Sequence, residues 1–152
     1  MKLLFLSFLI SAILPISWSE NFEEAKNEAK KSHKLILLNF SGSDWCGPCI
    51  RLRKEILQSE VFEGYAKEHL MLVNADFPRQ KKNQLPAAQV KLNEALADKY
   101  NSEGKFPFTL ILDENGKVIK SWEGYPNISP ENFVKEITAL EEKRWNAPKS
   151  IL

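Results

Sequence analysis

Two kinds of hydrophobic pattern alternate along the chain, and the first predicts β-strands. Residues 34–40 and 70–77 are short, largely apolar runs with polar residues on either side. Such runs are typical of strands buried on both faces, near the centre of a parallel or mixed sheet. Residues 108–122 predict a β-hairpin, because Asn115 and Gly116 form a strong turn signal between two apolar stretches.

The second pattern is helical, with apolar residues at every third or fourth position in the segments between the strands. Ser59 and Ser129 stand where a side-chain oxygen can cap a first helical turn, and Pro86 and Pro130 suit the start of a helix. The predicted helices cover 22–31, 46–57, 59–69, 86–101 and 129–145. Helices that alternate with two buried strands, followed by a hairpin, favour a three-layer α/β/α sandwich around a central mixed β-sheet.

The first residues have a different pattern from the rest. An early lysine is followed by an apolar run to about Ile16, and then by two small residues, Ser17 and Ser19. This order is that of a secretory signal peptide, so we expect residues 1–19 to direct export and residues 20–152 to form the mature domain in the periplasm. The alternative is an uncleaved anchor, although the run is shorter than the roughly 20 apolar residues that a spanning helix needs.

Composition supports one folded domain. The chain has 152 residues, of which 43% are hydrophobic and 27% charged, and it shows no internal repeat or linker. A chain of this kind can bury its own core, which excludes disorder as the main interpretation. The formal net charge is +1 without a strongly basic face, so we expect no nucleic-acid partner. No further domain or dimerisation segment stands out, and we expect a monomer.

The two cysteines, Cys46 and Cys49, both lie in the sequence WCGPC. A disulfide brace explains them poorly, because closing so small a ring removes little entropy from the unfolded chain. A structural zinc site needs four ligands, which would have to include both histidines of the chain, His33 and His69. Both histidines adjoin polar or charged residues at the ends of predicted elements, so we expect surface positions and no metal. A redox-active dithiol is the interpretation that remains.

The predicted helix start explains how this dithiol would react. Cys46 would lie at the helix N-terminus, where free backbone N–H groups and the helix dipole stabilise a thiolate. Cys49 lies one turn further on the same face, and Gly47 and Pro48 restrict the turn between them. Cys46 would attack a substrate disulfide, and Cys49 would then resolve the mixed disulfide. We expect no cofactor other than the Cys46–Cys49 disulfide itself.

The motif WCGPC, the preceding strand KLILLNF and the later segment KFPFTLILDENGKVIKSWEGY resemble the thioredoxin superfamily, over residues 21–144. Within it, the chain is similar to exported bacterial thioredoxin-like disulfide reductases, the DsbH-type periplasmic proteins. The resemblance implies a cis bond before Pro107 and a substrate peptide that pairs with the backbone of Phe106; the alternative is a proline that only starts an edge strand. The implied substrate-binding residues are Trp45, Gly47, Pro48, Phe106 and Pro107.

Two positions depart from the pattern that the resemblance implies. Asn39 stands on the strand where thioredoxins carry a buried aspartate beneath the second cysteine. An amide cannot accept the proton that leaves Cys49, so water or Asp44 would have to take it. The helix after Cys49 also lacks the family's kinking proline and has Lys54 near that place. We therefore expect a working nucleophile without full thioredoxin rates.

These observations favour a thiol–disulfide oxidoreductase that reduces disulfides of exported proteins and is recharged by a membrane electron donor. By resemblance, the sequence CGPC is associated with the reducing members. One alternative is an oxidase or isomerase of the same fold. Another is a non-catalytic binding or chaperone module, which would not need intact cysteines. We expect the basic segment 79–82 to be a solvated loop rather than a docking site.

Overall fold

The computed structural model describes residues 16–146. The strands are β1 (Trp18–Ser19), β2 (Leu35–Ser41), β3 (Leu70–Asp76), β4 (Phe108–Leu112) and β5 (Val118–Glu123). The α-helices are α1 (Phe22–Ser32), α2 (Gly47–Leu52), α3 (Glu60–His69), α4 (Ala87–Tyr100) and α5 (Pro130–Trp145). Two further short helices are the π-helix η1 (Arg53–Leu57) and the 3-10 helix η2 (Lys81–Asn83).

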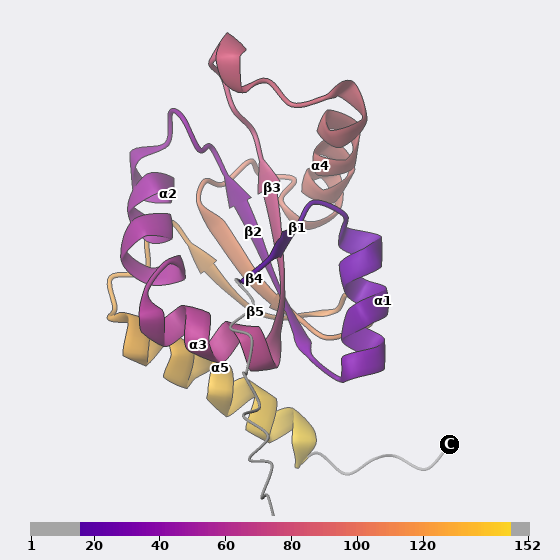
Figure 1. The fold of residues 1–152 in the computed structure, drawn as a ribbon, viewed down its shortest axis with the longest axis vertical. Helices are drawn as coiled ribbons and strands as arrows, with labels where there is room; N and C mark the ends of the chain where they lie inside the picture. The colour runs from indigo at the N-terminus through magenta and orange to yellow at the C-terminus, as the bar shows by residue number, and fades with distance from the viewer. Residues whose placement is uncertain (1–15, 147–152) are drawn as a thin grey trace, which may run out of the picture.

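The five strands form one mixed sheet in the order β1-β3-β2-β4-β5 (Figure 1). β2 runs parallel to β3 and antiparallel to β4, and β4 and β5 form the predicted hairpin. Gly116 takes a positive φ of 85° in the hairpin turn, a conformation that glycine adopts without steric cost. The predicted mixed sheet is therefore confirmed.

Helices cover both faces of the sheet, and the alternation of side chains along β2 divides the core between them. Ile36, Leu38 and Phe40 pack with α1 and α4 on one face. Leu35 and Leu37 pack with α2, η1, α3 and α5 on the other face. Figure 1 shows the same two groups of helices on opposite sides of the strands. The three-layer α/β/α sandwich is confirmed, and every residue of β2 is buried within it.

The edge strand β1 was not predicted from the sequence. Trp18 and Ser19 pair in parallel with Leu72 and Val73 of β3. The expected signal peptide lies largely outside the described residues, and its cleavage remains a prediction. Cleavage after Ser19 would remove β1 from the sheet. Within residues 16–146, no helix has the length and apolarity that crossing a bilayer requires.

The helix starts follow their capping residues, whereas one predicted helix is divided. The hydroxyls of Ser59 and Ser129 accept backbone N–H groups at the starts of α3 and α5, as expected. The predicted helix 46–57 is helical to Leu57, but α2 ends at Leu52 and continues as the π-helix η1. Lys54 lies in η1. A π segment is one of the devices that bend a helix, and here it occupies the place of the missing proline.

Candidate redox site

Cys46 and Cys49 form a disulfide at the start of α2, with their Cα atoms 5.2 Å apart. Cys46 is the N-cap residue of α2, and its sulfur accepts the backbone N–H of Cys49 at 3.3 Å. The predicted placement of this sulfur at a helix N-terminus is confirmed. Cys46 and Cys49 are only 5% and 2% exposed, so both are buried in this oxidised form. Gly47 and Pro48 between them are exposed, which leaves this side of the disulfide open to a second chain.

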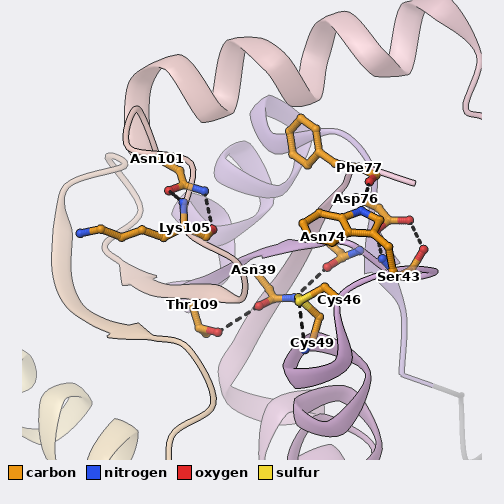
Figure 2. The surroundings of a disulfide bond; sticks show 11 residues. Asn39, Ser43, Cys46, Cys49, Asn74, Asp76, Phe77, Asn101, Lys105 and Thr109 are labelled. Carbon is orange, nitrogen blue, oxygen red and sulfur yellow. Dashed lines mark hydrogen bonds between the residues drawn. A yellow bond between two sulfur atoms is a disulfide. The ribbon is translucent and has the colours of Figure 1, made fainter. Parts of the chain in front are cut away.

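Asn39 lies in the surroundings of the disulfide and is part of a buried polar row across three strands (Figure 2). Its amide N–H donates to the Asn74 side-chain oxygen at 2.9 Å, and its own side-chain oxygen accepts the Thr109 hydroxyl at 2.9 Å. The sheet register places both partners directly opposite Asn39. The amide of Asn39 is thus satisfied by neutral groups, and no carboxylate takes part in this row.

A cavity of about 390 Å³ lies beside this row, and Asn39, Asn74 and Asp76 contribute to its lining. The Asp76 carboxylate accepts the backbone N–H of Ser43 at 2.9 Å and also the Ser43 hydroxyl. A polar cavity of this size can hold water, which needs two or more polar partners. Its lining includes Asn39, one of the residues around the disulfide, but neither cysteine.

Asp44 acts as a clamp for the loop that connects β3 to η2. Its carboxylate accepts the backbone N–H groups of Arg79 and Gln80 and the side-chain N–H of Asn83, each at 2.9 Å. The backbone N–H of Arg79, more than the other donors, holds the pKa of the Asp44 carboxyl below its usual value. Because three donors occupy this carboxylate and favour its charged form, Asp44 is poorly suited to take a proton from Cys49.

Trp45 is fastened next to the disulfide by contacts on several sides. Its indole N–H donates to the Phe77 carbonyl at 2.7 Å, and the Arg79 guanidinium lies 3.6 Å from the ring centroid. Phe106 meets the ring edge-on, with 5.5 Å between centroids. Gly42 lies against the ring so closely that a Cβ atom there would be 2.3 Å from Trp45 Cε2. The expected neighbourhood of Trp45 and Phe106 is therefore present.

The bond between Phe106 and Pro107 is cis, as the family resemblance implied. The buried Asn101 fixes Lys105, the residue just before Phe106. Its side chain accepts the Lys105 N–H at 2.9 Å and donates to the Lys105 carbonyl at 2.8 Å (Figure 2). On the other side, the Gly124 N–H donates to the Pro107 carbonyl at 2.8 Å. These bonds fix the backbone of the two residues that are expected to bind a substrate peptide.

The two histidines lie away from the cysteines. His33 ends α1 in a left-handed conformation with φ of 57°. His69 closes α3, and its Nδ1 lies 3.0 Å from a carboxylate oxygen of Glu141. Among residues 16–146, no group of three or more His, Cys, Asp or Glu side chains is arranged to hold a metal ion.

Sequence reasoning missed four residues of the site. Gly42 seats Trp45, Asn74 and Thr109 complete the row of Asn39, and Asn101 holds the segment before Pro107. Asn74 could have been found from its position on a predicted strand parallel to that of Asn39. Thr109 depends on the exact antiparallel register, and nothing in the sequence signals Asn101.

Comparisons with known proteins agree with this geometry. The model of the thioredoxin-like domain family matches residues 22–141. The chain is 41% identical over 102 residues to the disulfide bond reductase DsbH of Chlamydia pneumoniae. The aligned residues make up 67% of this chain and 59% of that protein. It is 27% identical over 127 residues to the thioredoxin-related protein DsbJ of the same species, covering 84% of this chain and 36% of that one. The chain thus spans about three fifths and about one third of the length of these curated relatives. A solved DsbH oxidoreductase superposes with a TM-score of 0.76 at 30% identity, covering 93% of this chain and 95% of the other.

Proposed function

Because the chain belongs to the thioredoxin-like domain family, we propose that it is a thiol–disulfide oxidoreductase that reduces disulfides of exported proteins. The observation that carries the proposal is the Cys46–Cys49 disulfide at the N-terminus of α2, where a backbone N–H already points at the Cys46 sulfur. The name of the relative DsbH, a disulfide bond reductase, supports the reducing direction. The pattern of residues 1–19 supports export to the periplasm, where a membrane electron donor would regenerate the dithiol.

The reaction begins from the reduced protein. The Cys46 thiolate attacks one sulfur of the substrate disulfide, a new S–S bond forms, and the other substrate sulfur leaves as a thiolate that takes up a proton. Cys49 then loses its proton and attacks the Cys46 sulfur, which releases the second substrate thiolate. Two electrons pass to the substrate, and the protein ends with the intramolecular disulfide.

Each part of the site has a role in these steps. The N-terminus of α2 stabilises the attacking thiolate of Cys46 by its backbone N–H groups. We assign substrate binding to Trp45, Phe106 and Pro107, where an extended substrate chain would pair with the backbone of Phe106. The proton of Cys49 would pass to water, because the Asn39 amide cannot accept it and the Asp44 carboxylate is occupied by three donors.

The equilibrium reduction potential of the purified protein tests the direction of electron flow. We expect about −250 mV or below, in the range of thioredoxin-like reductants. A value between about −120 and −150 mV would refute the reductase and indicate an oxidant of newly exported chains.

Two cysteine variants test the catalytic steps. Cys46→Ser should abolish reduction of a protein disulfide, whereas Cys49→Ser should accumulate a mixed disulfide that intact-mass spectrometry detects. A partner-binding or chaperone activity that is unchanged in Cys46→Ser, together with no reduction by the unchanged protein, would instead identify a binding or chaperone module.

A further inference from the structure

A basic loop lies at the same end of the sheet as the start of α2. We use this name for residues 78–85, which follow β3 and include η2. Figure 1 shows η2 projecting beyond the end of β3, at the end of the sheet where β2 leads into α2. Its cationic side chains, all exposed, are Arg79, Lys81 and Lys82.

The basic loop is bound directly to the two residues that precede Cys46. Asp44 accepts N–H groups from Arg79, Gln80 and Asn83, and the Gln80 side chain donates to the Asp44 carbonyl at 3.1 Å. The indole of Trp45 donates to the Phe77 carbonyl just before the loop. Because these bonds already fix the backbone, its cations need little further ordering when a partner binds.

The cations of the basic loop have no carboxylate partner in the part of the chain that the structure describes. Among residues 16–146, no carboxylate oxygen lies within 4.0 Å of a side-chain nitrogen of these three residues. By contrast, Lys105 pairs with Glu123, and Arg51 pairs with Glu55. The negative charge of Asp44 is held beneath the basic loop by backbone N–H groups.

Arg79 brings one positive charge of the basic loop close to the reacting sulfur atoms. Its guanidinium lies 3.6 Å from the ring centroid of Trp45, the residue next to Cys46. A carboxylate that pairs with Arg79 would therefore lie on top of Trp45, close to the disulfide. Lys81 and Lys82 follow two and three positions later, in η2.

We infer that the basic loop is a docking surface for a partner protein that carries acidic residues beside the disulfide exchanged with Cys46. The inference rests on the proposed function, and it differs from our expectation from the sequence, which was a solvated loop. The formal net charge of the whole chain is only +1, so the attraction is local to this loop. Complementary charges mainly raise the rate of productive encounter, and salt screens them.

The test uses two synthetic disulfide peptides of identical length. One carries Asp and Glu beside its cysteines, and the other carries Asn and Gln at the same positions. The rate at which the reduced protein reduces each peptide is measured in single turnover at low and at high salt. We expect the acidic peptide to react about tenfold faster at low salt and at the same rate as the neutral one at high salt.

Two matched variants locate the effect. Lys81→Gln/Lys82→Gln removes two of the three cations of the basic loop and should clearly lower the preference for the acidic peptide at low salt, whereas the remaining Arg79 keeps part of it. The control Lys30→Gln/Lys117→Gln removes two exposed cations at the opposite end of the sheet and should leave the tenfold preference intact.

The outcomes separate this inference from the proposed function. Equal rates for the two peptides at low salt, or a preference that is undiminished in Lys81→Gln/Lys82→Gln, would overturn the docking surface while the reductase stands. Failure to reduce either peptide would refute the proposed function, and the inference with it.

Discussion

Replacing Gly42 by alanine should unseat Trp45 and destabilise the protein. A Cβ atom at position 42 would lie 2.3 Å from Cε2 and 2.5 Å from Cζ2 of the indole, whereas ordinary contacts begin at 3.4 Å. The ring or the backbone must therefore move by about 1.1 Å, the difference between 3.4 and 2.3 Å. A shift of this size is incompatible with the present 2.7 Å hydrogen bond from Trp45 to the Phe77 carbonyl.

The expected loss follows from the contacts that hold the indole. The hydrogen bond to Phe77 contributes about 1 kcal/mol, the edge-on contact with Phe106 about 0.5–1.5 kcal/mol, and the Arg79 guanidinium about 0.5–1 kcal/mol. The lower entropy of an alanine in the unfolded chain offsets about 0.4–1 kcal/mol. Gly42→Ala should therefore cost about 2 kcal/mol, or a fall in Tm of about 4–8 °C for a domain of this size.

Guanidinium unfolding of the oxidised protein, followed by far-UV circular dichroism, measures this free energy. The matched control is Gly64→Ala, an exposed position in the middle of α3 where a Cβ meets nothing within 4 Å. It should stabilise the protein by up to about 1 kcal/mol, because alanine favours the helix. If the free energy of unfolding of Gly42→Ala is within about 0.5 kcal/mol of that of the unchanged protein, and the Trp fluorescence is the same, the close contact between Gly42 and the Trp45 ring is wrong.

Two further predictions concern the buried row and the clamp. Thr109→Val leaves the Asn39 side-chain oxygen buried without its donor and should lower the free energy of unfolding by about 1–3 kcal/mol in the same assay. The control Thr138→Val, at a half-buried position of α5, should lower it by less. Equal losses would contradict the stabilising role of the row formed by Asn39, Asn74 and Thr109. The lowered pKa of Asp44 means that its clamp contributes fully above the unfolded value of 3.8 and is lost as the pH falls through the folded pKa. The protection of the Gln80 amide, which is its exchange rate compared with that of an unstructured peptide at the same pH, should therefore fall only at strongly acidic pH. Asp44→Asn should show the lower protection already at neutral pH, and unchanged protection would refute the clamp.

Much of the site lies within a few residues of the cysteines, and this part could be predicted from the sequence. The disulfide closes between residues three positions apart, and the helix start next to Cys46 follows from local turn and capping chemistry. The β-hairpin turn at Gly116 and the caps at Ser59 and Ser129 are equally local. Such features depend on the conformations of neighbouring residues, so they can be predicted from the sequence without knowledge of the fold.

The rest of the site is made by contacts between distant segments. The clamp joins Asp44 to backbone groups 35 and 36 positions later, and the row joins Asn39 to Thr109 across 70 positions. The first needs a loop to fold back over the active site, and the second needs one particular antiparallel register. Hydrophobic periodicity predicts neither contact, because it does not show which polar residues of loops and strands will lie next to each other in the folded protein.

By itself, then, the sequence determined the sandwich, the dithiol and its place at a helix start, because short-range patterns of apolar, capping and turn residues specify them. Tertiary structure alone decided that Asp44 is a clamp rather than a proton acceptor, that Trp45 lies between Gly42 and Arg79, and that the basic loop stands beside the disulfide. The physical reason is that a residue's chemical role depends on which donors, rings and charges surround it. For these residues the surroundings come from segments that only folding brings together.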